Sequence, residues 1–402
     1  MKKKRVIWLL LLLVAGLGIL TAFVFTQSEP RFEGKPLSYW LKKNEAAPFD
    51  PEFRAKADAA LTAIGPKAIP MLLGLLRAKD SRLKIKAATL AEKVPLLHYS
   101  FWRARSRNQA GRHGFQVLGA QALGAVPELK AILERHISDE SEACTAWALG
   151  AIGPGARDAV PVLLRQLAGT NDHVRESVIW ALSAIHAYPE QVMPALIREL
   201  DNPNGSAPSR VYGALNAYGR DAGPALSGLL ARINSTNENV RSCIIFGLRK
   251  IHPAPDQVLP VLTQTLSDVN ARIGADAADT LGEYGLEAKP AVPALLEKIN
   301  DPNQLVRDSV VFALGKIHAS PELAVPALHQ SLADADRDVR RHAADSLGAF
   351  GNEAKPAVAA LLKMLNDPSE DQYARRCAEM ALKKIDPEAL DKAVKEGRVK
   401  LP

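Results

Sequence analysis

Along most of the chain, hydrophobic residues recur at helical spacing in pairs of short segments that polar breaks separate. In one such pair, Pro293 opens the first segment and residues 300–303 form the break. The second segment has its apolar residues at positions 306, 310, 313, 314 and 317, which places them on one face of a helix. Neither helix could bury that face alone, so we expect neighbouring pairs to stack and close a shared core.

The helix pairs repeat with a nearly constant period. A proline in the first turn of the first helix, where its missing N–H has no partner to lose, recurs every 33 or 34 residues. Ser227 and Ala359 occupy this position in two further units, and Pro70 opens an earlier, irregular one. The sequence thus predicts nine repeats, whose other prolines are Pro127, Pro161, Pro194, Pro260, Pro293 and Pro326.

The repeat has the form Val-Pro-x-Leu, then Asp-x-x-x-x-Val-Arg, then Ala-Leu-Gly-x-Ile, with Val-Arg pairs at 174–175, 240–241, 306–307 and 339–340. This motif resembles the HEAT repeat, and especially the short bacterial repeats of the PBS-lyase HEAT-like type. The resemblance covers roughly residues 51–386 and implies an all-α, right-handed α-solenoid. It says little about function, because HEAT arrays serve many roles.

The resemblance also implies contacts between repeats. In HEAT proteins the aspartate of the turn and the arginine of the second helix pair in a ladder. This implies two pairs in the present array, Asp301–Arg307 and Asp334–Arg340. At two repeats the arginine position holds another residue, so we expect the ladder to be interrupted at Pro208 and Gly274.

The repeats alternate in pairs, which makes a longer period of 66 residues. A glycine ends alternate second helices, and glycine readily adopts the left-handed conformation that ends many helices. The intervening second helices end in Ile-His, and we interpret these histidines as helix-end caps and surface packing. Two repeats separate neighbouring histidines by about 20 Å, too far to share a metal ion. The histidines are His186, His252 and His318, and the glycines are Gly153, Gly219, Gly285 and Gly351.

The position six residues before these histidines and glycines lies off the buried stripe of the second helix. In HEAT arrays the second helices line the concave face, so the resemblance implies that this position and the next turn face a groove. Aromatic anchors surrounded by mixed charge are typical of protein interfaces. The alternative is that each ring packs into the seam between adjacent repeats. The candidate partner-binding residues are Trp147, Trp180, Phe246, Lys250, Asp279, Glu283, Phe312 and Lys316.

The first 25 residues differ from the repeats. Residues 2–5 supply four positive charges of the net +7, and residues 6–25 carry none. Twenty residues at helical rise span about 30 Å, the hydrocarbon thickness of a bilayer. We favour an uncleaved transmembrane anchor at 6–25, with the N-terminus cytoplasmic and the repeats extracytoplasmic, in the periplasm if the source is bacterial. The first alternative is a cleaved signal peptide, although no Ala-x-Ala-like cleavage site follows the apolar run. The second is a buried core helix, which we favour least.

One segment breaks the repeat period, because Pro70 and Pro127 are 57 residues apart. Residues 95–113 carry aromatic side chains together with His98, His113 and the arginines at 103, 105 and 107. This insertion is either a binding loop or a cap over the open end of the first repeat. The predicted divisions are a basic stub (1–5), the anchor (6–25), linker and cap (26–50), a first irregular repeat (51–94), the insertion (95–113), the HEAT array (114–386) and a C-terminal cap or tail (387–402).

Charge and motifs argue against nucleic acid and against catalysis. Outside residues 2–5 the net charge is only +3, without the basic face that nucleic-acid binding needs. Three cysteines, Cys144, Cys243 and Cys377, are too few for a disulfide framework. The chain has no Cys-x-x-Cys, Gly-x-Ser-x-Gly or phosphate-binding glycine loop.

We therefore expect no catalytic residues, no metal ligands and no cofactor, and we expect that the protein is not an enzyme. The partner is expected to be an unidentified protein or peptide held in the groove, with no nucleic acid and no small-molecule substrate. The sequence thus favours a membrane-anchored interaction scaffold. The alternative function is an enzyme or an enzyme-accessory subunit that uses the 95–113 insertion.

Overall fold

The computed structural model describes residues 29–46, 50–82, 84–86, 102–202 and 207–399. The expected anchor at 6–25 lies outside these residues. The chain divides into two compact units, one ending at Leu196 and the other beginning at Ile197. Apart from a two-stranded hairpin of β1 (Arg31–Phe32) and β2 (Lys35–Pro36), the regular structure of the described residues is helical.

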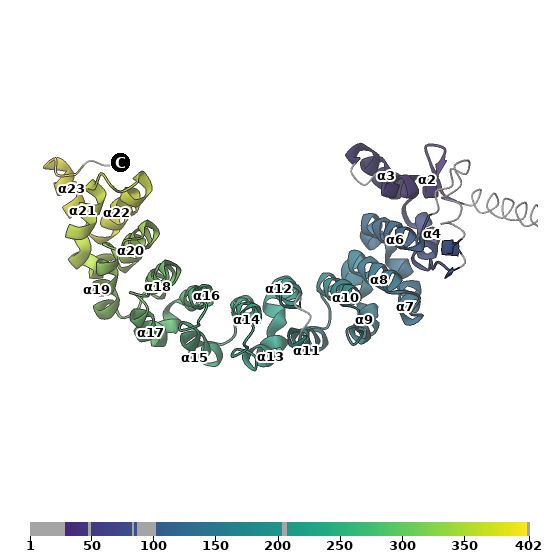
Figure 1. Ribbon diagram of the computed structural model, residues 1–402. Coiled ribbons are helices and arrows are strands. Elements are labelled where there is room, and N and C mark those ends of the chain that lie inside the picture. The colour runs from purple at the N-terminus through teal and green to yellow at the C-terminus, as the bar shows by residue number, and fades with distance from the viewer. Residues whose placement is uncertain (1–28, 47–49, 83, 87–101, 203–206, 400–402) are drawn as a thin grey trace, which may run out of the picture. The chain divides into compact units, whose positions relative to one another are not determined.

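In each unit the helices come in pairs, and we call the first helix of a repeat its A helix and the second its B helix. Figure 1 shows the A helices and the B helices of each unit in two adjacent rows. The helices of the first unit are α2 (Leu37–Ala46), α3 (Pro51–Ile64), η1 (Gly65–Ala68), α4 (Ile69–Leu76), α6 (Ala104–Leu118), η2 (Gly119–Ala125), α7 (Val126–Glu134), α8 (Asp139–Ile152), η3 (Gly153–Ala159), α9 (Val160–Gln166), α10 (Asp172–Ile185) and most of α11 (Pro189–Arg198).

The second unit continues the same alternation. Its B helices pack against one another in sequence order, and all but the first pack against the A helix of their own repeat. All the helices of this unit, in chain order, are η4 (Glu199–Asp201), α12 (Ala207–Tyr218), η5 (Gly219–Ala225), α13 (Leu226–Leu230), α14 (Glu238–Ile251), α15 (Pro255–Thr265), α16 (Ala271–Glu283), η6 (Gly285–Ala291), α17 (Val292–Glu297), α18 (Gln304–Ile317), α19 (Pro321–Ser331), α20 (Arg337–Phe350), η7 (Gly351–Ala357), α21 (Val358–Asn366), α22 (Gln372–Ile385) and α23 (Pro387–Lys395). The B helices among them are α12, α14, α16, α18, α20 and α22.

Helix α18 shows why the sequence forms these elements. It begins after Asn303, whose side chain accepts the N–H of Leu305 and so satisfies one of the free donors of the first turn. Its apolar residues at 306, 310, 313, 314 and 317 are buried, as the periodicity predicts. The expected all-α solenoid of stacked helix pairs is confirmed, whereas its handedness stays a prediction.

The alternation between histidine and glycine has a structural cause that the sequence did not reveal. His252 and His318 end their B helices in the left-handed conformation themselves, with φ of 50° and 49°, as Gly285 does with φ of 54°. The His252 ring stacks on Tyr284 of the next repeat at 4.4 Å, and His318 contacts Phe350 at 4.8 Å. The predicted packing role of His252 and His318 is therefore confirmed, at left-handed positions, whereas a favourable interaction with the helix end stays a prediction.

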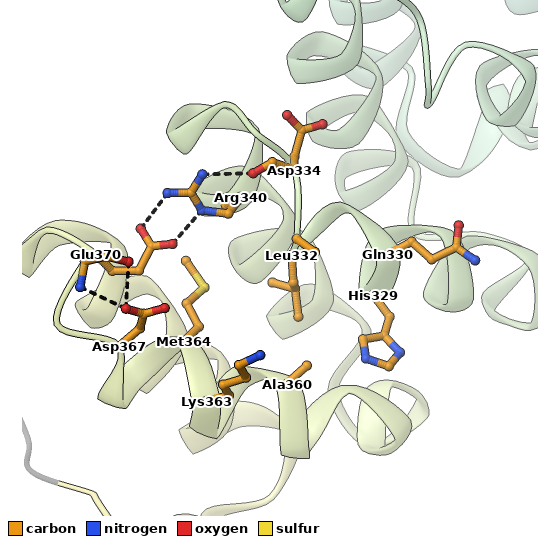
Figure 2. Close-up of a pocket in the computed structure, with 12 residues that line it drawn as sticks. His329, Gln330, Leu332, Asp334, Arg340, Ala360, Lys363, Met364, Asp367 and Glu370 are labelled. Carbon is orange, nitrogen blue, oxygen red and sulfur yellow. Dashed lines mark hydrogen bonds and ion pairs between the residues drawn. The ribbon is translucent and has the colours of Figure 1, made fainter.

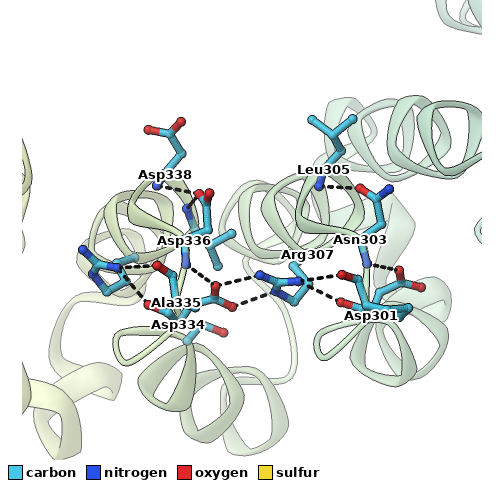
Figure 3. Close-up of polar contacts among 12 residues, drawn as sticks. Asp301, Asn303, Leu305, Arg307, Asp334, Ala335, Asp336 and Asp338 are labelled. Atoms are coloured by element: carbon cyan, nitrogen blue, oxygen red, sulfur yellow. Dashed lines mark hydrogen bonds and ion pairs between the residues drawn. The ribbon is translucent and has the colours of Figure 1, made fainter.

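The arginine ladder exists, but its pairs differ from those expected. Arg307 donates to the carboxylate of Asp334 in the next repeat through Nε and Nη2, at 2.8 and 2.9 Å. Towards its own repeat it donates to backbone carbonyls, those of Asp301 at 3.0 Å and Pro302 at 3.3 Å, and not to the Asp301 carboxylate (Figure 3). Arg340 likewise reaches Glu370 of the following repeat, with Nη2 and Oε2 2.9 Å apart. The expected side-chain pairs Asp301–Arg307 and Asp334–Arg340 are thus wrong, because the guanidinium spans the seam.

The ladder is interrupted where the sequence lacks the arginine. Gly274 supplies no guanidinium to Asp301, whose carboxylate instead accepts the N–H of Asn303 at 2.9 Å. One repeat earlier the ladder is intact, since Arg241 donates to Asp268 at 2.7 and 2.8 Å. Pro208, at the start of α12, has no side-chain donor for the contact either.

The insertion is shorter than the sequence predicts. Residues 95–101 lie outside the described part, but 104–113 belong to α6, which packs against α4 and α8. The buried Asn108 donates to the carbonyls of Leu75 and Leu76 at 2.9 Å, and so satisfies the C-terminal end of α4. Helix α6 is therefore the B helix of the first repeat. Its many polar residues concealed this role in the sequence.

The described N-terminal part forms a cap on the first repeat. Trp40 of α2 stacks on Phe53 of α3 at 5.6 Å, and its indole N–H donates to the carbonyl of Phe32. Among the described residues, one helical run, Pro51–Leu76, has the length and apolar composition to cross a membrane, and half of its most apolar window is buried. That run consists of α3, η1 and α4, which pack into the repeats, and it is distinct from the predicted anchor.

Candidate binding surface on the B helices

In the first unit the two candidate tryptophans stack on each other. Trp147 of α8 and Trp180 of α10 have ring centroids 3.6 Å apart and planes inclined by 24°. The guanidinium of Arg112 on α6 lies 5.1 Å from the Trp147 centroid. Gly150 makes the contact possible, because a Cβ there would come within 2.4 Å of the Trp180 ring. Both rings are half-buried, so this pair fits the alternative in which the aromatics close the seam.

In the second unit an aromatic pair and a lysine form a partly exposed group on α12 and α14. Phe246 stacks on Tyr212, with centroids 3.5 Å apart and planes inclined by 17°. Lys250, one turn after Phe246, places its ammonium 5.2 Å from the centre of that ring. Tyr212 is 44% exposed, so the stack offers an aromatic surface to a ligand.

Sequence reasoning missed Tyr212, because the aligned position in that repeat is Gly213. A Cβ at Gly213 would have no neighbour within 4 Å, which shows that this position is open. The aromatic ring comes instead from the residue immediately before the aligned position. The signal in the sequence is the tyrosine itself, which lies one residue before the position that the repeat period marks.

Helix α16 brings charge to this aromatic pair. Arg249 of α14 donates to Glu283 at 2.6 Å, and Arg272 lies 3.3 Å from Asp276. Burial raises the pKa of Asp279, which stands between them on the same helix face, although a hydrogen bond from Ser309 opposes the shift. The group therefore has three carboxylates on α16 and two paired arginines.

A hollow of about 580–620 Å³ occurs on each face of the second unit. The one on the B helices, of about 620 Å³, has Ile245 and Thr280 among its lining residues, with Tyr212 and Phe246 on one side and Glu283 on the other. It is large enough for one or two side chains of a partner. The structure thus brings together three of the predicted residues, Phe246, Lys250 and Glu283, and adds Tyr212, Arg249 and Arg272.

Phe312 and Lys316 on α18 repeat the arrangement of Phe246 and Lys250. The Lys316 ammonium lies 5.2 Å from the centroid of Phe312, whose side chain is 38% exposed. On the other side, Phe312 contacts the ring of His342 at 5.5 Å. His342 is hydrogen bonded to Asp308 at 2.5 Å, and this bond raises the pKa of His342 against the opposing effect of burial.

The second hollow, of about 580 Å³, lies at α19, α21 and the turns that precede their B helices (Figure 2). His329, Lys363 and Met364 contribute to its lining. Its two strongest charges, Arg340 and Glu370, bind each other as part of the ladder. Arg340 and Glu370 therefore serve to join repeats and are not available to a ligand in the way that the lysines of the B-helix face are.

In the described part of the 95–113 segment, the side chains of Arg107 and His113 bind other residues of the protein. Arg107 pairs with Asp80 at 2.9 Å, whose carboxylate also accepts the first N–H of α6. His113 is bonded to Asp58 of α3 at 2.7 Å. His98 lies outside the described residues. These contacts tie α6 to the preceding helices, and no observation favours catalysis there.

The cysteines are buried and unbridged. Burial raises the pKa of Cys144 and Cys243 to about 12 and that of Cys377 to about 11, which keeps them as unreactive thiols. Within the described ranges, no group of three or more His, Cys, Asp or Glu residues has the geometry to hold a metal ion.

Part of the chain matches a known family of repeats. The family described as HEAT repeats matches residues 126–215 and 292–383. A search among curated proteins finds no match.

Solved structures of similar fold include three karyopherin-type chains. Importin beta is 15% identical, with 87% of this chain and 55% of that chain covered and a TM-score of 0.55. Kap95p, solved with RanGDP, is 13% identical, with 90% and 57% covered and a TM-score of 0.57. Kap121p bound to the extreme C-terminus of the phosphatase Cdc14p is 13% identical, with 91% and 44% covered and a TM-score of 0.56.

The chain spans about half the length of these three proteins. At such low identity the likeness concerns the fold alone. The chain therefore carries HEAT repeats in the two matched segments and has the all-α solenoid fold seen in importin beta and the karyopherins.

Proposed function

We propose that this protein is an interaction scaffold that binds a protein or peptide partner along the B-helix face of its second unit. The observation that carries the proposal is the stack of the exposed Tyr212 on the half-buried Phe246, with Lys250 at its edge and a hollow beside it. Aromatic rings beside a desolvated pocket and a cation are the features that dominate protein interfaces. None of these three side chains closes the hydrophobic core, which leaves them available to a partner.

The fold supports the same proposal. Kap121p, which shares the solenoid fold, has been solved with the C-terminal segment of another protein bound to it. A solenoid presents a long surface on which one row of helices repeats the same positions, and such surfaces suit extended partners. For the present chain, the B-helix row of the second unit is that surface.

The test is capture of the partner by the full chain in membranes of the cells that produce it. A photoreactive benzoylphenylalanine at Ser242, which lines the hollow, would crosslink whatever occupies it. We expect the variant with Tyr212→Ala and Phe246→Ala to lose about tenfold in crosslinked product, because two anchor residues are removed. The control is Leu286→Ala, at a residue that is 68% exposed on η6, away from the hollow.

Equal capture by the aromatic double variant and the unmodified protein would refute this site. Helical circular dichroism of both variants, which should match the unmodified protein, separates loss of a contact from loss of the fold. A captured protein that depends on Leu286 as strongly as on Phe246 would likewise contradict the proposal.

We also propose that residues 6–25 anchor the scaffold in a membrane with the repeats on the extracytoplasmic side. The support is the uncharged run of twenty residues behind four basic ones. In spheroplasts, protease added outside should digest the repeats, and the anchor should resist extraction by alkaline carbonate. Release of the intact chain by carbonate would refute the anchor, and protection of the repeats would refute the orientation.

A further inference from the structure

Charges of alternating sign cross three neighbouring B helices of the second unit. Lys250 on α14 and Lys316 on α18 each lie 5.2 Å from the ring of the phenylalanine one turn earlier. Between them, α16 carries Asp279 and Glu283 at the same two positions of the repeat. Helix α16 packs directly against both α14 and α18, so the order across the surface is cation, anion, cation.

Among the residues that the structure describes, the two lysines have no acidic partner. No carboxylate of the described residues lies within ion-pair distance of Lys250 or Lys316, although most arginines nearby are paired. On α16 the balance is reversed: Glu283 pairs with Arg249 and Asp276 with Arg272, while Asp279 has a hydrogen bond from Ser309 and no cation of its own. The surface therefore has an unpaired lysine at each end and one carboxylate more than arginines at its centre.

The spacing of these charges matches one kind of backbone. Packed helices lie about 8–10 Å apart, so α14, α16 and α18 present charges at that interval. A polyproline II segment has three residues per turn and rises about 3.1 Å per residue, so residues i, i+3 and i+6 lie on one side at intervals of about 9 Å. A β-strand fits less well, because its side chains alternate and residue i+3 would point away from residues i and i+6.

We propose that this surface binds an extended, polyproline II-like segment of the partner protein, with acidic side chains at i and i+6 and a basic side chain at i+3. The acidic residues pair with Lys250 and Lys316, and the basic residue faces Asp279 and Glu283. The inference rests on the proposed function, because it names the chemistry of the partner at the same B-helix face.

The probe is a synthetic fluorescent peptide with Glu at i and i+6, Lys at i+3 and Pro at the other positions, which holds the backbone in the required conformation. Binding to the detergent-solubilised full chain is followed by fluorescence anisotropy at low salt. Peptides of the same composition, in which the two glutamates are about five or seven residues apart, serve as register controls. We expect the six-residue spacing to bind at least about threefold more tightly than either control, and salt to weaken it.

Protein variants locate the binding. Lys250→Gln and Lys316→Gln should each weaken binding about threefold and together about tenfold, as expected for partly exposed ion pairs. The matched control is Lys289→Gln, an exposed lysine on η6, which should leave binding unchanged. In a chain with Lys250→Glu and Lys316→Glu, a peptide with Lys at i, i+3 and i+6 should bind better than the original peptide, and this reversal shows that the variant is folded.

Equal binding of all peptide spacings, absence of binding, or equal effects of Lys289→Gln and Lys250→Gln would overturn the inference. If a natural partner is nevertheless captured in a manner that requires Tyr212 and Phe246, the proposed function stands and only the recognition chemistry is wrong. If neither the peptides nor a natural partner depends on this face, both proposals fail.

Discussion

Arg307 of one repeat binds the carboxylate of Asp334 of the next repeat with two hydrogen bonds of 2.8 and 2.9 Å. The same guanidinium donates to the carbonyl of Asp301 in its own turn at 3.0 Å. One side chain thus joins two turns, and it is only 15% exposed. The hydrogen bonds from Arg307 also hold the pKa of Asp334 below its usual range, although burial opposes the shift.

The ladder predicts a specific loss of stability. Arg307→Met keeps much of the side-chain volume but leaves the buried carboxylate of Asp334 without its cation, so unfolding should become easier by about 2 kcal/mol. Arg165→Met is the control, because Arg165 and Glu134 form a pair that is more than half exposed and worth about 0.5 kcal/mol. Urea denaturation followed by circular dichroism measures both. A smaller loss for Arg307→Met than for Arg165→Met would contradict the role of the ladder.

The bond between His342 and Asp308 predicts a dependence on pH. Because Asp308 raises the folded-state pKa of His342, the stabilisation is complete below the unfolded pKa of about 6.5 and is lost as the pH rises through the higher folded value. The urea midpoint of the protein should therefore decrease as the pH is raised from about 5.5 to about 8.5, a range that spans the reference pKa and the higher folded value.

Two variants check the assignment of this pH dependence. His342→Gln and Asp308→Asn should each remove the same part of the fall in the urea midpoint, since either change removes one partner of the same ion pair between α18 and α20. If the two variants keep the full pH dependence of the unmodified protein, another group is responsible.

Gly150 is predicted to be essential for the tryptophan stack. Gly150→Ala places a Cβ 2.4 Å from the Trp180 ring and 2.8 Å from the backbone of Ala181, so we expect a loss of about 1–3 kcal/mol from overpacking. The near-ultraviolet circular dichroism of the stacked indoles should change as well. Gly213→Ala is the matched control in a B helix, where the open space predicts a gain of about 0.5–1 kcal/mol from helix propensity.

At His252, substitution by glycine should cost less stability than substitution by alanine, which is the reverse of their order inside a helix. His252→Ala removes the stacking on Tyr284 while a side chain stays in the left-handed conformation. His252→Gly removes the same stacking but relieves the conformational cost, so it should be more stable than the alanine variant by about 1 kcal/mol. Thermal unfolding of the two variants measures the difference. A more stable alanine variant would show that the left-handed position carries no such cost.

The elements of this fold follow from local patterns. In α18 the apolar spacing placed the buried face correctly, and the polar break before Asn303 marked its start. Helix α6 was missed over its first ten residues, because Arg105, Arg107 and Asn108 obscure its periodicity. The burial of Asn108 depends on carbonyls of α4, more than thirty residues away, and no local pattern encodes that contact.

The sequence by itself determined the helix pairs, their period and the candidate positions on the B helices, because periodicity and proline placement act within a single repeat. Only the tertiary structure decided which side chains meet across the seam between repeats. In the structure Arg307 binds Asp334 and not the predicted Asp301. Tyr212 stacks on Phe246, and Trp147 stacks on Trp180. The physical reason is that such contacts depend on how one repeat stacks on the next, a geometry set by the packing of both.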